Sequence, residues 1–265
     1  MQTADGEPSS HPSVSLRRLS DLPPRRLRLG AARFLYFAYG VFFVAYHLCY
    51  ENVKNHTDGM EYLSDWTFIL LGMVFGLLAM FSLQPSTAEA PQLVELTTAM
   101  HGVCWSSNIV STAGAWYSFF FFPVCKSLEG VDNYPWCYLE WYRITEHALN
   151  MVFLFGDCFA GAVPVRRKDL GWSVIFLQCY AVYTWHRMFT TGKCAYIMFD
   201  FSTGWASIAW TNAAFVGIAL AHVVTERLFA LRDRRRQGGV GNVGRVGSDG
   251  SLPSHARYDA LSNSD

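Results

Sequence analysis

Six apolar stretches separated by short polar loops dominate the pattern of hydrophobic and polar positions along the chain. Each stretch is roughly 20 residues long, which is the length that an α-helix needs to cross the hydrocarbon core of a bilayer. The stretches predicted to cross the membrane are Gly30–Tyr50, Tyr62–Leu83, Thr98–Phe122, Arg143–Pro164, Leu170–Phe189 and Gly204–Leu228. The pattern therefore predicts an all-α integral membrane protein, a bundle of six transmembrane helices.

The two ends of the chain lack this apolar pattern. Residues 1–29 are rich in Ser, Pro and Arg, and they contain no apolar segment typical of a cleavable signal peptide. Residues 229–265 are first basic and then rich in Gly and Ser. Such compositions bury too little apolar surface to fold. We therefore expect a disordered cytoplasmic tail on each side of a membrane domain formed by residues 30–228.

Composition and charge support this interpretation. The chain is 51% hydrophobic and only 16% charged, whereas a soluble domain carries about a quarter charged residues. No nucleotide or zinc motif is recognisable. We therefore expect the lipid bilayer as a partner, with no nucleic acid, cofactor or metal.

Lysine and arginine residues beside the predicted spans are divided unequally between the two sides of the membrane. With the N-terminus inside, the thirteen on the cytoplasmic side are Arg17, Arg18, Arg25, Arg26, Arg28, Arg166, Arg167, Lys168, Arg227, Arg232, Arg234, Arg235 and Arg236. The five on the opposite side are Lys54, Lys126, Arg143, Arg187 and Lys193. Because positive charge concentrates on the cytoplasmic side, both termini are predicted to be cytoplasmic, in the plasma membrane or an endomembrane.

Two features of the non-cytoplasmic loops depend on this topology. Cys125 and Cys137 are candidates for a disulfide if that side is oxidising. The sequon that begins at Asn55 lies on the same side, but it is too close to the predicted membrane edge for glycosylation to be expected.

The predicted fourth helix carries a polar stripe. His147, Asn150, Asp157 and Gly161 recur at spacings that place them on one helical face. A charge at mid-bilayer costs at least about 2.5–3.5 kcal/mol on insertion scales, so this face must point into the bundle. In a structural interpretation, the stripe links helices through hydrogen bonds, Gly161 permits close approach, and Asp157 pairs with a donor from another helix.

A catalytic interpretation depends on depth in the membrane. At about 1.5 Å per residue, the topology gathers one polar set in the outer leaflet and another in the inner leaflet. The outer set is Ser64, Asp65, Glu146, His147, His47 and His186, and the inner set is His101, His222 and Asp157. A hydroxyl and an imidazole at one depth, here Ser64 and His147, are the minimum for nucleophilic catalysis, and Asp65 or Glu146 could orient the imidazole.

The fourth predicted helix also resembles a known family. The run HALNMVFLFGDCFAGAVP, residues 147–164, resembles the rolling stone family of multi-pass membrane proteins. Further stretches similar to that family are Val182-Tyr183-Thr184, Tyr196…Asp200…Trp205 and Tyr62-Leu63-Ser64-Asp65-Trp66. The resemblance covers residues 30–228 and is strongest around the fourth helix.

Rolling stone proteins are in turn distantly similar to the androgen-induced hydrolases, which cleave fatty acid esters of hydroxy fatty acids. In those hydrolases a threonine on an early helix is the nucleophile and a histidine on a later helix assists it. By position, Ser64 corresponds to the threonine and His147 to the histidine. The resemblance implies an intramembrane lipid-ester hydrolase, with Asp65, Asn150 and Asp157 as polar support.

Two other classes of function stay open. The first is a non-catalytic membrane protein in adhesion, fusion or assembly, since the rolling stone branch is associated mainly with myoblast fusion. The second is a haem protein, because histidines can supply axial ligands. The candidate ligands are His147, His47 and His186 in the outer leaflet and His101 and His222 in the inner leaflet.

Overall fold

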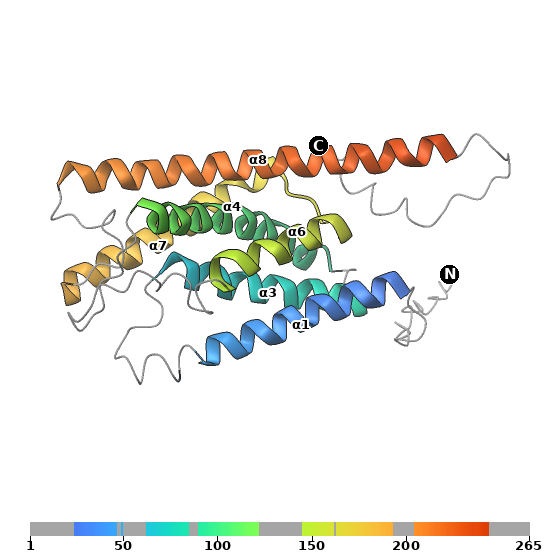
Figure 1. Cartoon of the computed structure of the whole chain (residues 1–265), viewed down its shortest axis with the longest axis horizontal. Coiled ribbons are helices and arrows are strands. Elements are labelled where there is room, and N and C mark those ends of the chain that lie inside the picture. The colour runs from blue at the N-terminus through green and yellow to red at the C-terminus, as the bar shows by residue number, and fades with distance from the viewer. Residues whose placement is uncertain are drawn as a thin grey trace, which may run out of the picture. The chain divides into compact units, whose positions relative to one another are not determined.

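A computed structural model of the chain describes residues 24–46, 49, 62–84, 90–121, 145–161, 163–192 and 204–243. Within these ranges almost every residue is helical and no strand occurs, which confirms the predicted all-α fold (Figure 1). The long helices are α1 (Pro24–Tyr46), α3 (Leu63–Leu83), α4 (Pro91–Phe121), α6 (Asn150–Ala160), α7 (Leu170–Thr191) and α8 (Trp205–Val243). The short ones are a π-helical turn, η5 (Thr145–Leu149), and a 3₁₀ turn, η6 (Arg167–Asp169).

Three of the described helices are long and apolar enough to cross a membrane: α1, α3 and residues 207–236 of α8. The helices α4 and α7 also reach the required length, but polar side chains such as Asn108 and Gln178 make them less apolar. The apolar segment His147–Ala160 is shorter than a typical span. The structure thus has the apolar helices expected of a membrane protein.

Two helices extend into segments predicted to be disordered. Helix α1 begins at Pro24 rather than Gly30, because proline is favoured in the first helical turn and the Arg and Leu residues after it have high helix propensity. Helix α8 continues to Val243 rather than ending at Leu228. Residues 229–236 are rich in Arg, Leu and Ala, which favour a helix, whereas residues 237–243 contain three glycines and have low helix propensity. The prediction of disorder is therefore wrong for residues 24–29 and 229–243. The rest of both tails lies outside the described residues.

Other helix ends also differ from the prediction. Helix α4 begins at Pro91 rather than Thr98, again with proline in the first turn. The predicted fourth helix is divided into η5 and α6, and it ends at Ala160 instead of Pro164. It ends there because Gly161 is extended (ψ 175°), although its N–H still donates to the backbone oxygen of Asp157.

Helices α1 and α3 pack side by side through glycines (Figure 1). A Cβ atom on Gly30 would lie 2.7 Å from Leu83 Cδ2, and one on Gly76 would lie 2.9 Å from Phe37 Cδ2. These distances are shorter than a Cβ atom tolerates, so the Leu83 and Phe37 side chains occupy the space that the two glycines leave open. The N-terminal end of α1 thereby meets the C-terminal end of α3.

The chain divides into two compact units, residues 1–229 and 230–265, and the packing described below lies within the first unit.

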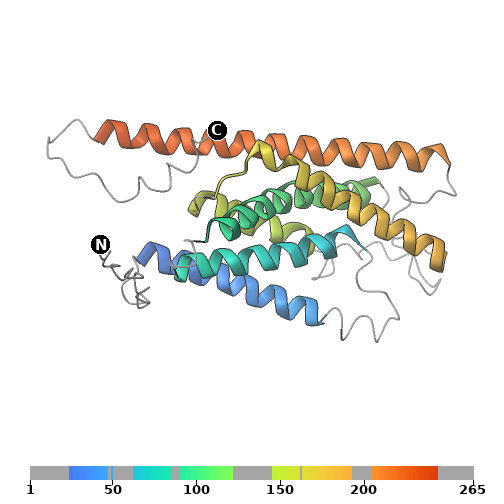
Figure 2. The ribbon, with the colours of Figure 1, turned by 180° about the vertical axis from the view of Figure 1, so that it is seen from behind.

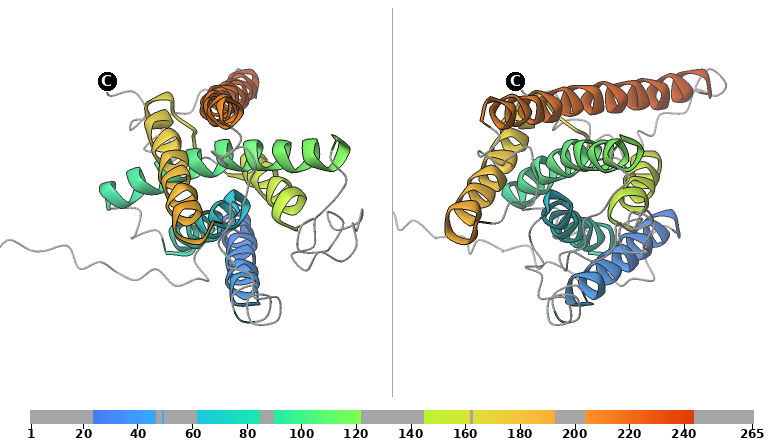
Figure 3. Two further views of the ribbon diagram at one scale, coloured as in Figure 1. Left: turned by 90° about the vertical axis from the view of Figure 1, so that its left-hand side faces the viewer. Right: turned by 60° about the vertical axis from the view of Figure 1, so that its left-hand side comes forward.

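Aromatic side chains fill the core of the first unit. Tyr36 of α1, Trp105 of α4 and Phe229 of α8 are each at most 1% exposed. The Trp105 and Phe229 rings meet edge to face with centroids 5.3 Å apart. Figures 2 and 3 show α4 between α3 and α7, so α4 supplies side chains to several interfaces.

Candidate functional site

A buried ion pair joins α1 to α6. Arg33 Nε donates a hydrogen bond to Asp157 Oδ1 at 2.6 Å, and the two side chains are 7% and 4% exposed. The prediction that Asp157 pairs with a donor from another helix is therefore confirmed. Sequence reasoning did not identify Arg33, although it is the only Asp, Glu, Lys or Arg between Leu29 and Tyr50. That isolated charge in an apolar stretch was the available signal.

Residues from further helices surround the pair. Arg33 Nη1 also donates to Ser82 Oγ at 2.7 Å, at the C-terminal end of α3. His101 Nε2 of α4 lies 3.9 Å from Asp157 Oδ2. Gly161 leaves room for the guanidinium, since a Cβ there would lie 2.8 Å from Arg33 Nη2. Four helices thus meet at one charge pair, whose burial would be costly if either partner were missing.

Asn150 links three helices in the same core. Tyr36 of α1 donates its hydroxyl hydrogen to Asn150 Oδ1 at 2.5 Å, and Asn150 Nδ2 donates to Asn108 Oδ1 of α4 at 3.2 Å. Asn108 Nδ2 in turn donates to the backbone oxygen of Cys104 at 2.9 Å. All of these side chains are buried. The face that carries Asn150 and Asp157 therefore points inward, and its polar atoms are used in contacts between helices.

Ser64 and His147, the predicted nucleophile and base, lie on adjoining segments. Ser64 is in the first turn of α3, is 1% exposed, and its Oγ has no hydrogen-bond partner among the described residues. His147 belongs to η5, which packs against α3, and its backbone oxygen accepts a hydrogen bond from Thr112 Oγ1 at 2.9 Å. The segments adjoin, and Ser64 Oγ does not hydrogen-bond to His147 in this structure.

Asp65 acts at the start of α3. Its Oδ2 accepts a hydrogen bond from the backbone N–H of Tyr62 at 3.0 Å. This is the contact by which an acidic residue in the first turn reaches back in a capping box, and the helix dipole favours a negative charge there. Capping of α3 by the Asp65 carboxylate therefore competes with its predicted role, which is to orient the His147 imidazole. The side chain of Glu146, the other candidate, lies outside the described residues.

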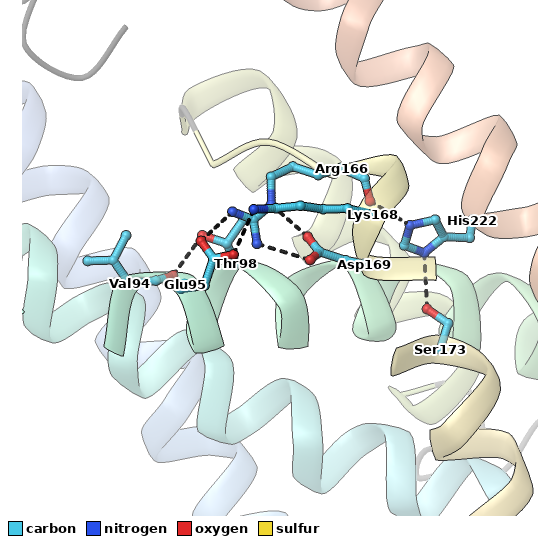
Figure 4. A network of polar contacts seen from close by, with 8 residues as sticks. All are labelled: Val94, Glu95, Thr98, Arg166, Lys168, Asp169, Ser173 and His222. Atoms are coloured by element: carbon cyan, nitrogen blue, oxygen red, sulfur yellow. Dashed lines mark hydrogen bonds and ion pairs between the residues drawn. The ribbon is translucent and has the colours of Figure 1, made fainter. Parts of the chain in front are cut away.

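A hydroxyl–imidazole hydrogen bond that sequence reasoning missed connects α7 and α8 (Figure 4). Ser173 Oγ lies 3.0 Å from His222 Nδ1, and both residues are fully buried. His222 Nε2 lies 3.0 Å from the backbone oxygen of Arg166. A carbonyl oxygen only accepts, so Nε2 carries the hydrogen, and in a neutral ring Nδ1 accepts from Ser173. Ser106 Oγ donates to Ser173 Oγ at 2.8 Å, which extends this series of hydrogen bonds to α4.

Charged side chains gather beside this pair, between α4 and η6 (Figure 4). Arg166 contacts Glu95 at 2.6 Å and Asp169 at 2.7 Å, and Lys168 Nζ lies 2.9 Å from Glu95. Hydrogen bonds from Arg166 and Lys168 lower the pKa of Glu95 from 4.5 to about 2. Partial burial alone would lower the pKa of Arg166, but its hydrogen bonds to Asp169 and Glu95 raise it overall. Glu95 and Arg166 are therefore both charged at neutral pH.

The histidines proposed as haem ligands are only partly described. Both ring nitrogens of His222 are engaged by Ser173 and Arg166, so haem ligation by His222 would require breaking a hydrogen bond. His186 is exposed on α7. Across the described ranges, no three or more His, Cys, Asp or Glu residues gather to hold a metal ion. His47 lies outside the described residues, as do Asn55 of the sequon and the two disulfide candidates, Cys125 and Cys137.

Comparisons with protein-family models, curated proteins and solved structures found no match for this chain. Any assignment of function therefore depends on the chemistry of the residues that the structure describes. Most of the buried polar groups described above satisfy one another across helices. The Ser64 hydroxyl is one of several buried side-chain groups without a hydrogen bond to any described residue; Trp105 Nε1 and Ser111 Oγ are others.

Proposed function

We propose that the chain is a multi-pass integral membrane protein in which six helical segments form the bundle and both termini are cytoplasmic. Three helices of spanning length and apolar character support this. The pairing of Arg33 with Asp157 also fits a bundle that shields charge from lipid. The distribution of Lys and Arg in the loops supports the orientation.

Within this bundle, the protein acts as a rolling stone-type hydrolase of lipid esters, with Ser64 as nucleophile and His147 as base. The observation that carries this proposal is the Ser64 hydroxyl, buried and without a hydrogen bond to any residue that the structure describes. Leaving such a group unsatisfied costs about 1–3 kcal/mol, and a native group of this kind calls for an explanation. His147 lies in a π-helical turn that packs against α3, and such turns are frequent at functional sites.

In the proposed reaction, Ser64 Oγ attacks the carbonyl carbon of the ester while a ring nitrogen of His147 takes the hydroxyl proton. That proton passes to the departing alcohol oxygen as the ester bond breaks, which leaves an acyl group on Ser64. A water molecule, deprotonated by His147, then attacks the acyl carbon, and the proton passes from His147 to Ser64 Oγ as the fatty acid is released. Proton transfer requires about 2.6–3.2 Å between Ser64 Oγ and a ring nitrogen of His147, so substrate binding must bring these two atoms to that distance.

Labelling of the purified full chain with a fluorophosphonate probe tests this function. Wild type should be labelled and should hydrolyse a fatty acid ester, whereas Ser64→Ala should lose both. His147→Ala should lose hydrolysis by at least about a hundredfold, because general-base catalysis contributes that much. Ser173→Ala is the matched control, since Ser173 is another buried serine with a histidine partner. It should retain both labelling and activity.

Two results would assign the chemistry elsewhere. Labelling that survives in Ser64→Ala but disappears in Ser173→Ala would show that the nucleophile is Ser173, the hydrogen-bond partner of His222. Hydrolysis unchanged in both Ser64→Ala and His147→Ala would remove these residues from the reaction. Monodispersity of each variant in detergent separates lost chemistry from lost folding.

A non-catalytic role in adhesion, fusion or assembly is the second candidate. It is favoured by Asn150 and Asp157, whose side chains are engaged in bonds between helices. Wild-type protein that hydrolyses no member of a broad ester panel, yet promotes fusion of cells that express it, would support this role. Ser64→Ala should then promote fusion as well as wild type does.

A further inference from the structure

A groove lies between the N-terminal end of α1 and the C-terminal end of α6. Its volume is about 350 Å³, and its lining residues are Pro24, Arg25, Arg28, Leu29, Ala32 and Ala160. Two of these side chains are cationic and none is acidic. The others are apolar, so the groove combines positive charge with a hydrophobic wall.

Of the four arginines of α1, two bind to other described helices and two do not. Arg26 Nη2 donates to the backbone oxygen of Phe81 at 3.1 Å, and Arg33 is committed to Asp157, so both bind within the bundle. Arg25 and Arg28 are exposed and form no hydrogen bond or ion pair with a described residue. Their charges are therefore available to a ligand, whereas the nearby charge of Asp157 is already neutralised by Arg33.

We propose that this groove binds an anionic phospholipid, with its phosphate at Arg25 and Arg28 and the start of an acyl chain along Leu29, Ala32 and Ala160. The charge complements a phosphate, and arginine binds phosphate oxygens with several N–H donors. Helix α1 is a candidate membrane span whose arginine-bearing end is where headgroups would lie. The apolar wall continues from that end along α1, as an acyl chain requires.

This site is separate from the proposed hydrolysis. Gly30 at this end of α1 meets Leu83 at the C-terminal end of α3, whereas Ser64 lies at the other end of α3. At 1.5 Å per residue, Ser64 and Leu83 are about 28 Å apart along the helix. The inference requires α1 to lie in a membrane, but it does not require Ser64 to be a nucleophile.

Native mass spectrometry of the full chain in detergent, titrated with dioleoylphosphatidylglycerol or dioleoylphosphatidylcholine, tests the proposal. Wild type should retain the anionic lipid in preference to the zwitterionic one. Each arginine that contacts the phosphate contributes about a fivefold gain in affinity for the anionic lipid, so Arg25→Gln/Arg28→Gln should bind it about 30-fold more weakly. The control Arg234→Gln/Arg235→Gln removes two exposed arginines of α8 and should bind as wild type does.

A second variant tests the apolar wall. Ala32→Trp keeps both arginines but fills the groove, so this variant should also lose the lipid. A competition experiment uses wild type, from which 10 mM glycerol phosphate should fail to displace the lipid. Displacement by glycerol phosphate would show a site for free phosphate and overturn the lipid assignment. Equal retention of both lipids by wild type, or equal losses in the groove and control variants, would overturn the site. Ser64→Ala should bind the lipid normally, so this result is independent of hydrolysis.

Discussion

Arg33 and Asp157 are 124 residues apart in the chain, yet Arg33 Nε donates to Asp157 Oδ1 at 2.6 Å in a buried contact. The bond connects the first described helix to the polar face of α6. Ser82 of α3 and His101 of α4 lie next to the same two groups. This contact is therefore a point at which a single substitution should disturb four helices.

Asp157→Leu should destabilise the protein by about 3–5 kcal/mol, because it leaves the Arg33 guanidinium buried without its carboxylate. Asp157→Asn should cost less, since the amide oxygen can still accept from Arg33. Thermal unfolding and monodispersity in detergent measure the difference. Equal stability of the two variants would mean that position 157 faces lipid or an open cavity.

Arg33→Leu/Asp157→Leu tests whether the cost comes from the unpaired charge. Removing both charges together should be less damaging than Asp157→Leu alone, because apolar replacements of buried ion pairs are often tolerated. The same unfolding measurement, analysed as a double-mutant cycle, gives the coupling between the residues. Additive losses would contradict a direct interaction.

Gly161→Ala should destabilise the protein by about 1–3 kcal/mol, because overpacking a filled interior costs about that much. Its Cβ would lie 2.8 Å from Arg33 Nη2 and 2.7 Å from the backbone oxygen of Asp157. Gly156→Ala in α6 is the matched control, since nothing lies within 4 Å of its Cβ position. That control should be neutral or stabilising by up to about 1 kcal/mol, and a similar loss in both variants would contradict the explanation.

Glu95 should make stability depend on acid pH. Its pKa is lowered to about 2 in the folded protein, so its contribution is present above 4.5 and is lost as the pH falls from 4.5 towards 2. The glutamate side chain is 54% exposed, which limits the effect to about 1 kcal/mol or less. Unfolding of wild type and Glu95→Gln, measured from pH 7 to pH 2.5, should converge at the acid end. If the difference in unfolding free energy between wild type and Glu95→Gln stayed constant across this range, the ion pair of Glu95 would not be its cause.

Ser173→Ala should destabilise the protein by about 1–3 kcal/mol, because His222 Nδ1 would lose its buried partner. Ser207→Ala is a suitable comparison, since Ser207 Oγ is buried but bonds only locally, to the backbone oxygen of Gly204 at 2.9 Å. Chemical or thermal unfolding should show the smaller loss for Ser207→Ala. The reverse order would indicate that the bond between α7 and α8 contributes little.

Arg167→Cys tests the proposed orientation. Arg167 is exposed in η6, so a cysteine there should react with a membrane-impermeant maleimide only after the cells are permeabilised. Wild type provides the background from native cysteines. Labelling from outside intact cells would reverse the orientation and would place Ser64 and His147 in the cytoplasmic instead of the outer leaflet.

The helical class and the approximate positions of α3 and α7 follow from the sequence alone. Their apolar residues form runs of spanning length, and helical hydrogen bonds are local, so the pattern of nearby residues is sufficient. Helix ends were less predictable in polar segments. Residues 24–29 and 229–236 are rich in good helix formers but contain no apolar run, so a criterion based on apolarity excludes them. Residues 237–243 include three glycines, so neither apolarity nor helix propensity predicts their helix.

The inward direction of the face bearing Asn150 and Asp157 also follows from the sequence, because lipid cannot solvate a carboxylate. The identity of each partner does not. Arg33, Tyr36 and Asn108 are brought to that face by contacts between distant helices, and no local pattern records those contacts. For the same reason, the sequence predicted a shared depth for Ser64 and His147, but it decided neither the contact between their segments nor their hydrogen bonding. Rotation of each helix about its axis is set by side-chain packing across the whole bundle, so only the tertiary structure decided which polar groups meet.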